Sequence, residues 1–204
     1  MRLTRKPMRI STYLRCIFSI ALVLALSQAH GAASPDFGTD LHGQPIRRLA
    51  APGVRVVVLF FAASDCPISN RYVPEIARLT QQFTTQGVHF WWVYPNADDT
   101  AQVVAAHNHD YAVNGDTILD PRQSLVELAH TTVTPEVAVF LVEGSILKEV
   151  YHGRIDDRYI SLGQERPQAS YHDLELAITA ALASKPVPQP AGPPVGCSIV
   201  FLQK

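Results

Sequence analysis

The sequence predicts an α/β domain with a mixed central sheet and helices on both faces. Strand-like and helix-like segments alternate along the chain. Residues 54–61 (VRVVVLFF) form a nearly continuous apolar run, which is typical of a central strand covered on both faces. Residues 136–142 and 146–151 are strand-like and flank a Glu-Gly-Ser turn, which predicts a hairpin. This order gives a sheet with a parallel centre and one antiparallel side.

The other elements follow from the spacing of apolar residues and from capping residues. Apolar side chains at three- and four-residue intervals predict one helix over 71–83 and another over 171–183. Asp98 or Asp99 is positioned to cap a helix that runs through His109. The remaining predicted strands are 88–94 and 113–120.

Three parts of the chain differ in composition. Residues 1–29 place basic side chains ahead of an apolar run and end in a small-residue cleavage site, which predicts a signal peptide, with an uncleaved anchor as the alternative. Residues 30–185 hold all the predicted strands and helices and form one domain. Residues 186–204 form a Pro-rich arm that ends in a short apolar segment, which we expect to dock on the domain. The signal predicts a periplasmic or secreted protein.

The charge of the exported part argues against some partners. Five of the 17 lysines and arginines lie within residues 1–29 and none of the 18 acids does, so residues 30–204 carry a net charge of 12 − 18 = −6. This charge disfavours binding to nucleic acid. No segment after residue 29 has the ~20 apolar residues that a membrane span needs.

The most reactive feature is Cys66, which lies where the first long strand gives way to a helix. A thiol at a helix N-terminus faces free backbone N–H groups and the positive end of the helix dipole, and both favour the nucleophilic thiolate. Pro67 suits the first position of that helix, whereas the carboxylate of Asp65 favours the protonated thiol. The alternative is a buried structural cysteine.

Several motifs together resemble the redoxin branch of the thioredoxin superfamily, which includes alkyl hydroperoxide reductases and thiol-specific antioxidant proteins. These motifs are FFAASDCPISN at the end of the first long strand, Val133-Thr134-Pro135-Glu136 before a later strand, and a hairpin with a terminal helix. The resemblance covers residues 36–184 and implies a thioredoxin-like fold. The run 151–159 (YHGRIDDRY) with the late Gly-Cys is similar to an exported subgroup of that branch.

The resemblance also implies roles for individual residues. Cys66 takes the position of the nucleophilic cysteine, and Pro135 that of the cis-proline that faces it. Because proline has no N–H, we expect the edge beside Thr134-Pro135 to stay open for an extended substrate that adds as a strand. The residues that we assign to substrate binding are Thr134, Ser69, Asn70 and Arg154.

The chain departs from the patterns of three thioredoxin-fold groups. Ser69 replaces the second cysteine of the reductase motif C-x-x-C, so the adjacent resolving thiol is missing. Ala63 stands where peroxiredoxins have a threonine that orients the peroxide, and Ser64 offers the nearest hydroxyl. Ala62 stands where copper-delivering members have their first cysteine. We therefore expect no metal and no cofactor.

Cys197 is the candidate for the missing resolving thiol. The Pro-rich arm can span ~31 Å when extended, which is enough to carry Cys197 across one face of a small domain to Cys66. Attack of one thiol on the oxidised other would give a distal disulfide. The alternative is a permanent disulfide that only holds the tail down.

Two further groups of polar residues have simpler interpretations. His107 and His109 lie two positions apart on a helix, so we expect a solvated face rather than a metal site. The charged residues of 154–158 are expected to form a surface ion network, with Arg154 or Arg71 as an alternative partner for Cys66 or for the substrate.

The sequence therefore predicts an exported thioredoxin-fold thiol-disulfide oxidoreductase that acts through Cys66, with Cys197 as its distal resolving cysteine. Its expected partners are a protein or small-molecule disulfide, or a peroxide, and a thiol electron donor. One alternative is a peroxiredoxin-like thiol peroxidase. The other is a non-catalytic binding module with a structural Cys66–Cys197 disulfide.

Overall fold

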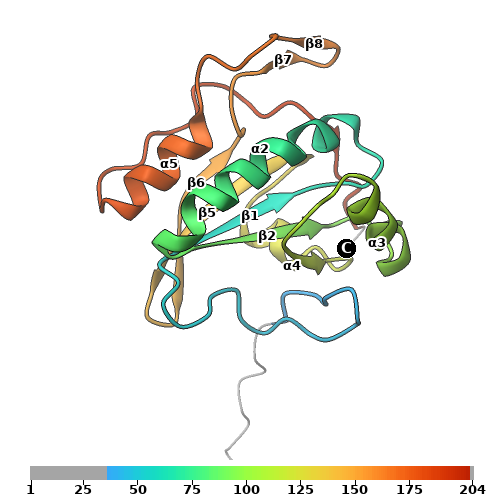
Figure 1. The fold of residues 1–204 in the computed structure, drawn as a ribbon. Helices are drawn as coiled ribbons and strands as arrows, with labels where there is room; N and C mark the ends of the chain where they lie inside the picture. Colours follow the sequence, from blue (N-terminus) through green and yellow to red (C-terminus); the bar gives the residue numbers. More distant parts are fainter. Residues whose placement is uncertain (1–35, 203–204) are drawn as a thin grey trace, which may run out of the picture. The chain divides into compact units, whose positions relative to one another are not determined.

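The computed structural model describes residues 36–202, and the predicted signal peptide lies outside the described residues. The domain alternates strands and helices around one five-stranded sheet (Figure 1). No helix of residues 36–202 has the length and apolarity needed to cross a membrane. The elements are β1 (Val56–Phe61), α2 (Pro67–Phe83), the 3-10 helix η2 (Thr84–Gln86), β2 (Val88–Tyr94), α3 (Ala101–Asp110), β3 (Asp116–Leu119), α4 (Ser124–Leu128), β4 (Val133–Thr134), β5 (Glu136–Glu143), β6 (Ile146–Gly153), β7 (Tyr159–Ser161), β8 (Gln164–Glu165), α5 (Asp173–Leu182) and β9 (Cys197–Ser198).

The strand order of the sheet brings the two main motifs to the same end of the neighbouring strands β1 and β5. The order is β3-β2-β1-β5-β6, with β1, β2 and β3 parallel and β5 and β6 antiparallel to their neighbours, as the sequence predicts. Phe61, the last residue of β1, lies opposite Glu136, the first residue of β5. The loop after β1, which holds Cys66, therefore meets the Thr134-Pro135 turn that precedes β5.

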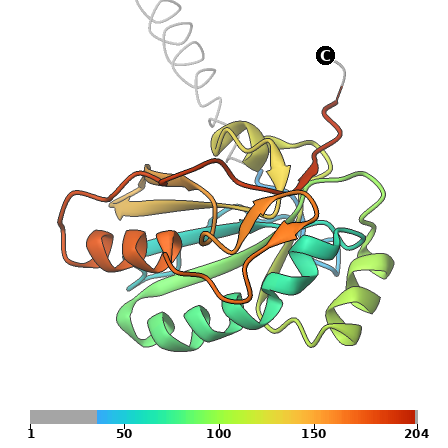
Figure 2. The ribbon, with the colours of Figure 1, turned by 90° about the horizontal axis from the view of Figure 1, so that it is seen from above.

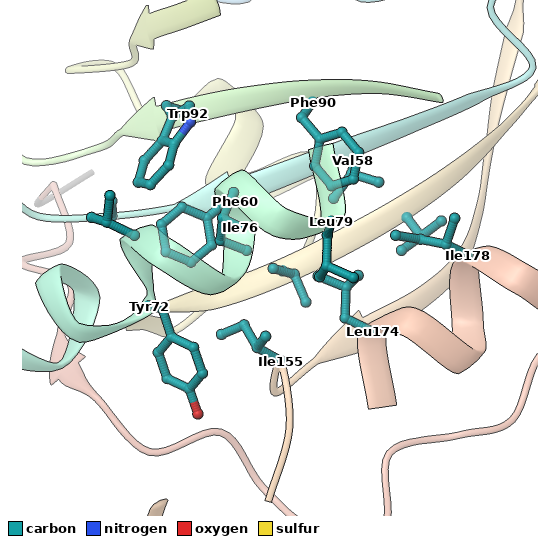
Figure 3. Close-up of a cluster of buried hydrophobic side chains, with 14 of the residues drawn as sticks. Val58, Phe60, Tyr72, Ile76, Leu79, Phe90, Trp92, Ile155, Leu174 and Ile178 are labelled. Atoms are coloured by element: carbon teal, nitrogen blue, oxygen red, sulfur yellow. The ribbon is translucent and has the colours of Figure 1, made fainter. Parts of the chain in front are cut away.

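Apolar side chains fill both faces of the sheet. Alternation along β1 sends Val58 and Phe60 to one face, where they pack with α2, α3 and α5 (Figure 3). Phe60 and Trp92 make an edge-to-face contact with ring centroids 4.7 Å apart. On the other face, Leu59 packs with α4 and with the segment before β1. Helices thus cover both faces of the sheet, as predicted.

Two helices begin at other residues than the sequence predicts. Helix α2 begins at Pro67, four residues before the predicted start at residue 71, and Cys66 is its N-cap. Helix α3 is capped by Thr100, whose hydroxyl accepts a hydrogen bond from the N–H of Val103 at 3.3 Å. Asp99 does not cap α3, because its carboxylate accepts hydrogen bonds from Ser64 instead.

The Pro-rich arm is extended and returns from the end of α5 to β4 (Figure 2). Its C-terminal segment docks on the domain, as expected: Cys197–Ser198 forms β9, and Ile199 is buried in the core. The amide of Gln123 donates a hydrogen bond to the carbonyl of Val200 at 2.7 Å. The arm is therefore held in place by side chains that lie far from it in the sequence. The small hairpin of β7 and β8 has no counterpart among the predicted elements.

Candidate functional site

Cys66 lies in the interior at the N-terminus of α2. It has no exposed surface, and its N–H donates to the carbonyl of Ala63 at 3.1 Å. Its own carbonyl accepts the N–H of Asn70 at 3.1 Å, which closes the first turn of the helix. This turn aims the thiol at the neighbouring loop, where the Cys66 Sγ donates to the carbonyl oxygen of Thr134 at 3.2 Å.

The loop that faces Cys66 is the one predicted from the Thr-Pro motif. The Thr134-Pro135 peptide bond is cis. The 3.2 Å contact between Cys66 and Thr134 confirms that this segment lies beside the thiol. Glu136 fixes the loop through a hydrogen bond: it is buried, and its carboxylate accepts the N–H of Thr132 at 3.0 Å.

Cys197 reaches the same place from the other end of the chain. Strand β9 pairs antiparallel with β4, with Cys197 opposite Thr134. Both thiols are free, and both lie against Thr134: the Cys66 Sγ donates to its carbonyl oxygen, and Cys197 is its partner in the β9–β4 pair. Gly196 makes this approach possible, because a Cβ at that position would overlap the carbonyl oxygen of Thr134.

The surroundings of the pair favour the thiolate on Cys66. Burial raises the pKa of Cys66, but hydrogen bonds from the Cys197 thiol and from the N–H and hydroxyl of Ser69 together lower the pKa below its ordinary value. Burial and the hydrogen bond to Cys66 both raise the pKa of Cys197. Of the two thiols, Cys66 is therefore the one that loses its proton more easily.

A comparison with protein families agrees with this arrangement. The family model described as Redoxin matches residues 29–160. The chain belongs to the Redoxin family. A comparison with curated proteins finds no match.

Solved structures show the same fold for this redoxin. An uncharacterized conserved protein from Geobacillus kaustophilus is 23% identical, with a TM-score of 0.67, and the match covers 84% of this chain and 91% of that one. The hypothetical protein SMc02350 from Sinorhizobium meliloti 1021 is 21% identical, with a TM-score of 0.67 and coverage of 84% and 93%. A secreted Mycobacterium tuberculosis disulfide oxidoreductase, described as homologous to E. coli DsbE, is 16% identical, with a TM-score of 0.47 and coverage of 72% and 93%.

The hydroxyl groups near Cys66 differ in what they contact. Ser69 is almost completely buried; its hydroxyl oxygen accepts the N–H of Ala63 at 3.5 Å, and its N–H and hydroxyl are among the groups that lower the pKa of Cys66. Ser64 donates both its N–H and its hydroxyl to Asp99. Of the two serines, only Ser69 stabilises the Cys66 thiolate in this redoxin.

A buried histidine supports the first turn of α2. His107 Nε2 lies 2.7 Å from Asn70 Oδ1, and His107 Nδ1 lies 3.1 Å from the hydroxyl of Tyr94. The expectation that His107 lies on a solvated face is therefore wrong, whereas His109 is exposed. The side-chain amide of Asn70 donates to the carbonyl of Ser64 at 3.4 Å. Asn70 thus connects α3 to the loop that carries Cys66.

The two arginines that the sequence singles out are paired with carboxylates. Arg154 Nε donates to Asp173 at 2.7 Å, and the Asp173 side chain is buried. Arg71 pairs with Glu165 at 3.0 Å in an exposed position. Arg154 therefore binds α5. It also lines, together with Pro135, a small cavity of about 10 Å³.

Sequence reasoning missed Asp99 and His107 as neighbours of the site. Asp99 precedes α3 and His107 lies within it, and both are more than 30 positions from Cys66 in the sequence. The only signal was Asp99 itself, which the capping pattern explained in another way.

A group of possible metal ligands, Glu75, His172 and Glu175, joins α2 to α5. Arg78 already pairs with both of these glutamates, so we assign no metal there.

Proposed function

We propose that this redoxin is an exported thiol-disulfide oxidoreductase in which Cys66 is the nucleophile and Cys197 the resolving cysteine. The observation that carries the proposal is the pairing of β9 with β4, which places Cys197 opposite Thr134, the residue whose carbonyl oxygen accepts the Cys66 thiol at 3.2 Å. Two cysteines 131 positions apart in the sequence meet there. The export part of the proposal rests on the composition of residues 1–29.

The reaction starts from the thiolate of Cys66, which the lowered pKa favours. Its thiolate attacks one sulfur of a substrate disulfide, and this forms a mixed disulfide while one substrate thiolate leaves. Cys197 then attacks the Cys66 sulfur and releases the second substrate thiolate. The two protein thiols thereby give two electrons and two protons to the substrate, which becomes two thiols. An external thiol donor returns the Cys66–Cys197 disulfide to the reduced state.

Four further residues support this chemistry. The N–H and hydroxyl of Ser69 stabilise the Cys66 thiolate. The carbonyl of Thr134 accepts the protonated Cys66 thiol. Pro135 contributes no N–H to the loop that faces the sulfur. We assign Asn70 a positioning role, through its contacts with His107 and Ser64.

Cys66 has no exposed surface, so access to it is part of the proposed mechanism. Cys197 is partly exposed and belongs to a strand of two residues. A substrate sulfur reaches Cys66 when the side chain of Cys197 moves away from β4. The resolving thiol therefore also covers the nucleophile.

Paired serine variants test the proposal. Cys66→Ser should abolish disulfide exchange, whereas Cys197→Ser should allow one attack that ends in a mixed disulfide on Cys66. Mass spectrometry under nonreducing conditions identifies the trapped species and its position. Equal losses of melting temperature in both variants, with no trapped species in Cys197→Ser, would show that the pair is only a structural disulfide.

A peroxide assay separates the same proposal from a peroxidase. Ala63 supplies no hydroxyl to orient a peroxide, and the hydroxyl of Ser64 is bound to Asp99. We therefore expect the reduced protein to lose its thiols much faster with a small disulfide than with hydrogen peroxide. The reverse order of rates would favour the peroxidase.

A further inference from the structure

A cavity of about 580 Å³ lies beside Cys197, between the loop before α3 and the C-terminal tail. Its volume is within the range of small-molecule sites, ~300–1,000 Å³. Cys197 forms part of its wall, and Ser64 and Asp65 from the Cys66 loop form another part. A molecule in this cavity therefore lies next to the thiol pair.

The charge of the lining is of one sign. Asp65, Asp98 and Asp99 all line the cavity, and its lining contains no lysine, arginine or histidine. None of the three carboxylates forms an ion pair among the described residues. Burial raises the pKa of Asp99, and the base that opposes this rise from outside the lining is His107, whose ring nitrogens face Asn70 and Tyr94. The cavity is thus an acidic site without its own counter-charge.

One of the two carboxylate oxygens of Asp99 lacks a hydrogen-bond donor among the described residues. It is 7% exposed, and its Oδ1 accepts the N–H and hydroxyl of Ser64. Its Oδ2 is buried and has no partner among the described residues, and the same holds for Oδ1 of Asn96, another lining residue. Buried acceptors of this kind are usually paired. Two such oxygens at one acidic cavity call for a ligand that carries several N–H donors and a positive charge.

The tail limits the size of that ligand. Strand β9 occupies the edge of β4 where an extended protein segment would otherwise add, and Cys66 itself is enclosed. Val103, Val200 and Phe201 line the rest of the cavity and offer apolar contact to short methylene chains. A small molecule that combines a disulfide, short methylene chains and an ammonium group fits these conditions.

We propose that this cavity binds small disulfides that carry an ammonium group and presents their sulfur atoms to the Cys197 side of the thiol pair. This inference rests on the proposed function. On binding, the side chains of Asp99 and Asn96 turn their unpartnered oxygens toward the ammonium group, which also balances the charges of Asp65 and Asp98. The disulfide is reduced by the two protein thiols to two aminothiols, with Cys66–Cys197 as the oxidised product.

Three small disulfides of similar size test the proposal on the full mature protein: cystamine with two ammonium groups, bis(2-hydroxyethyl) disulfide without charge, and 3,3′-dithiodipropionate with two carboxylates. The leaving thiols of the three disulfides differ in pKa. The rate of protein thiol loss with each disulfide is therefore divided by the rate at which 2-mercaptoethanol reduces the same disulfide. We expect the normalised rate with cystamine to exceed that with dithiodipropionate by about tenfold or more. The excess should shrink as salt is added.

Two variants locate the effect, with a third as control. Asp99→Asn keeps an acceptor for Ser64 but removes the charge, and Asp98→Asn removes an exposed charge of the same cavity. Both should reduce the preference for cystamine several-fold. Glu143→Gln removes one negative charge at the end of β5 that lies away from the Thr134-Pro135 turn. This control should keep the preference for cystamine.

The outcomes distinguish the two proposals. If no disulfide oxidises the thiol pair, the proposed function fails. If all three disulfides react at equal normalised rates, the exchange function stands and the cavity proposal is wrong. A preference for cystamine that Glu143→Gln reduces as much as Asp99→Asn would reflect the net charge of the protein and would also overturn the cavity proposal.

Discussion

Cys197 lies opposite Thr134 in the antiparallel pair of β9 and β4, so the chain's own tail occupies the sheet edge beside Cys66. The sequence predicted that this edge would stay open for an extended substrate, and that prediction is wrong. The edge has backbone groups that need partners, and the tail supplies them: the N–H of Ile199 donates to the carbonyl of Thr132 at 3.2 Å. Access to Cys66 therefore depends on the tail.

Gly196→Ala tests this dependence. The added Cβ would overlap the Thr134 carbonyl, so it should push β9 away from β4. We expect two changes in the pH profile of Cys66 alkylation by iodoacetamide: a higher plateau rate, because the thiol is exposed, and a higher apparent pKa, because the hydrogen bonds from Cys197 are lost.

Gly192→Ala is the matched control in the same arm. Its Cβ would meet only the end of the Arg154 side chain, at 2.9 Å from Nη1, and that side chain can shift. Its profile should resemble that of the wild type. An unchanged profile in Gly196→Ala would show that β9 does not limit access to Cys66.

Ser69→Ala should raise the pKa of Cys66. The Ser69 hydroxyl is one of the groups that lower this pKa, and a hydrogen bond to a charged group contributes about 1.5–3 kcal/mol. Since about 1.36 kcal/mol corresponds to one pKa unit, we expect a rise of about one to two units. Below the new pKa, alkylation of Cys66 should be slower than in the wild type.

Ser64→Ala serves as the comparison for Ser69→Ala. Its hydroxyl is bound to Asp99, so the pKa of Cys66 should stay the same. Equal shifts in both variants would mean that the loop as a whole, and not the Ser69 hydroxyl, sets the pKa.

Arg154→Met should destabilise the fold without changing the thiol chemistry. It leaves the buried carboxylate of Asp173 without its ion pair, which typically costs about 3–5 kcal/mol. Urea unfolding measures the loss. Asp173 also accepts the N–H of Ala191, but the pairing of β9 with β4 still holds the end of the arm that carries Cys197. A variant with normal stability but impaired disulfide exchange would support the predicted role of Arg154 in substrate binding.

His107→Ala should remove the link between α3 and α2. Asn70 Oδ1 would lose its contact with His107, and a group left unsatisfied costs about 1–3 kcal/mol, whereas the hydroxyl of Tyr94 keeps its hydrogen bond to Asn108. The exposed His109→Ala on the same helix should unfold at the same urea concentration as the wild type. Equal midpoints for both variants would contradict the structural role of His107.

The sequence alone was enough to predict the fold class, a sheet with a parallel part and an antiparallel part, and the Cys66 loop. The apolar run of 54–61, the hairpin over 136–151 and the Thr134-Pro135 motif are local patterns, and each reflects burial or backbone geometry within a few residues. Parallel strands and a hairpin then leave few ways to arrange the sheet. The proximity of Cys66 to Thr134 followed from this arrangement and is confirmed at 3.2 Å.

The tertiary structure decided what surrounds the thiol. Asp99 looked like a helix cap and His107 like a surface residue, because a capping pattern and a helical period describe only the residue's own segment. In the folded chain, Ser64 and Asn70 supply partners from a loop and a helix more than 30 positions away. The sequence suggested that Cys197 could reach Cys66, but only the pairing of β9 with β4 placed the two thiols together and closed the edge of β4. Such contacts depend on how separate segments pack, and no local pattern encodes them.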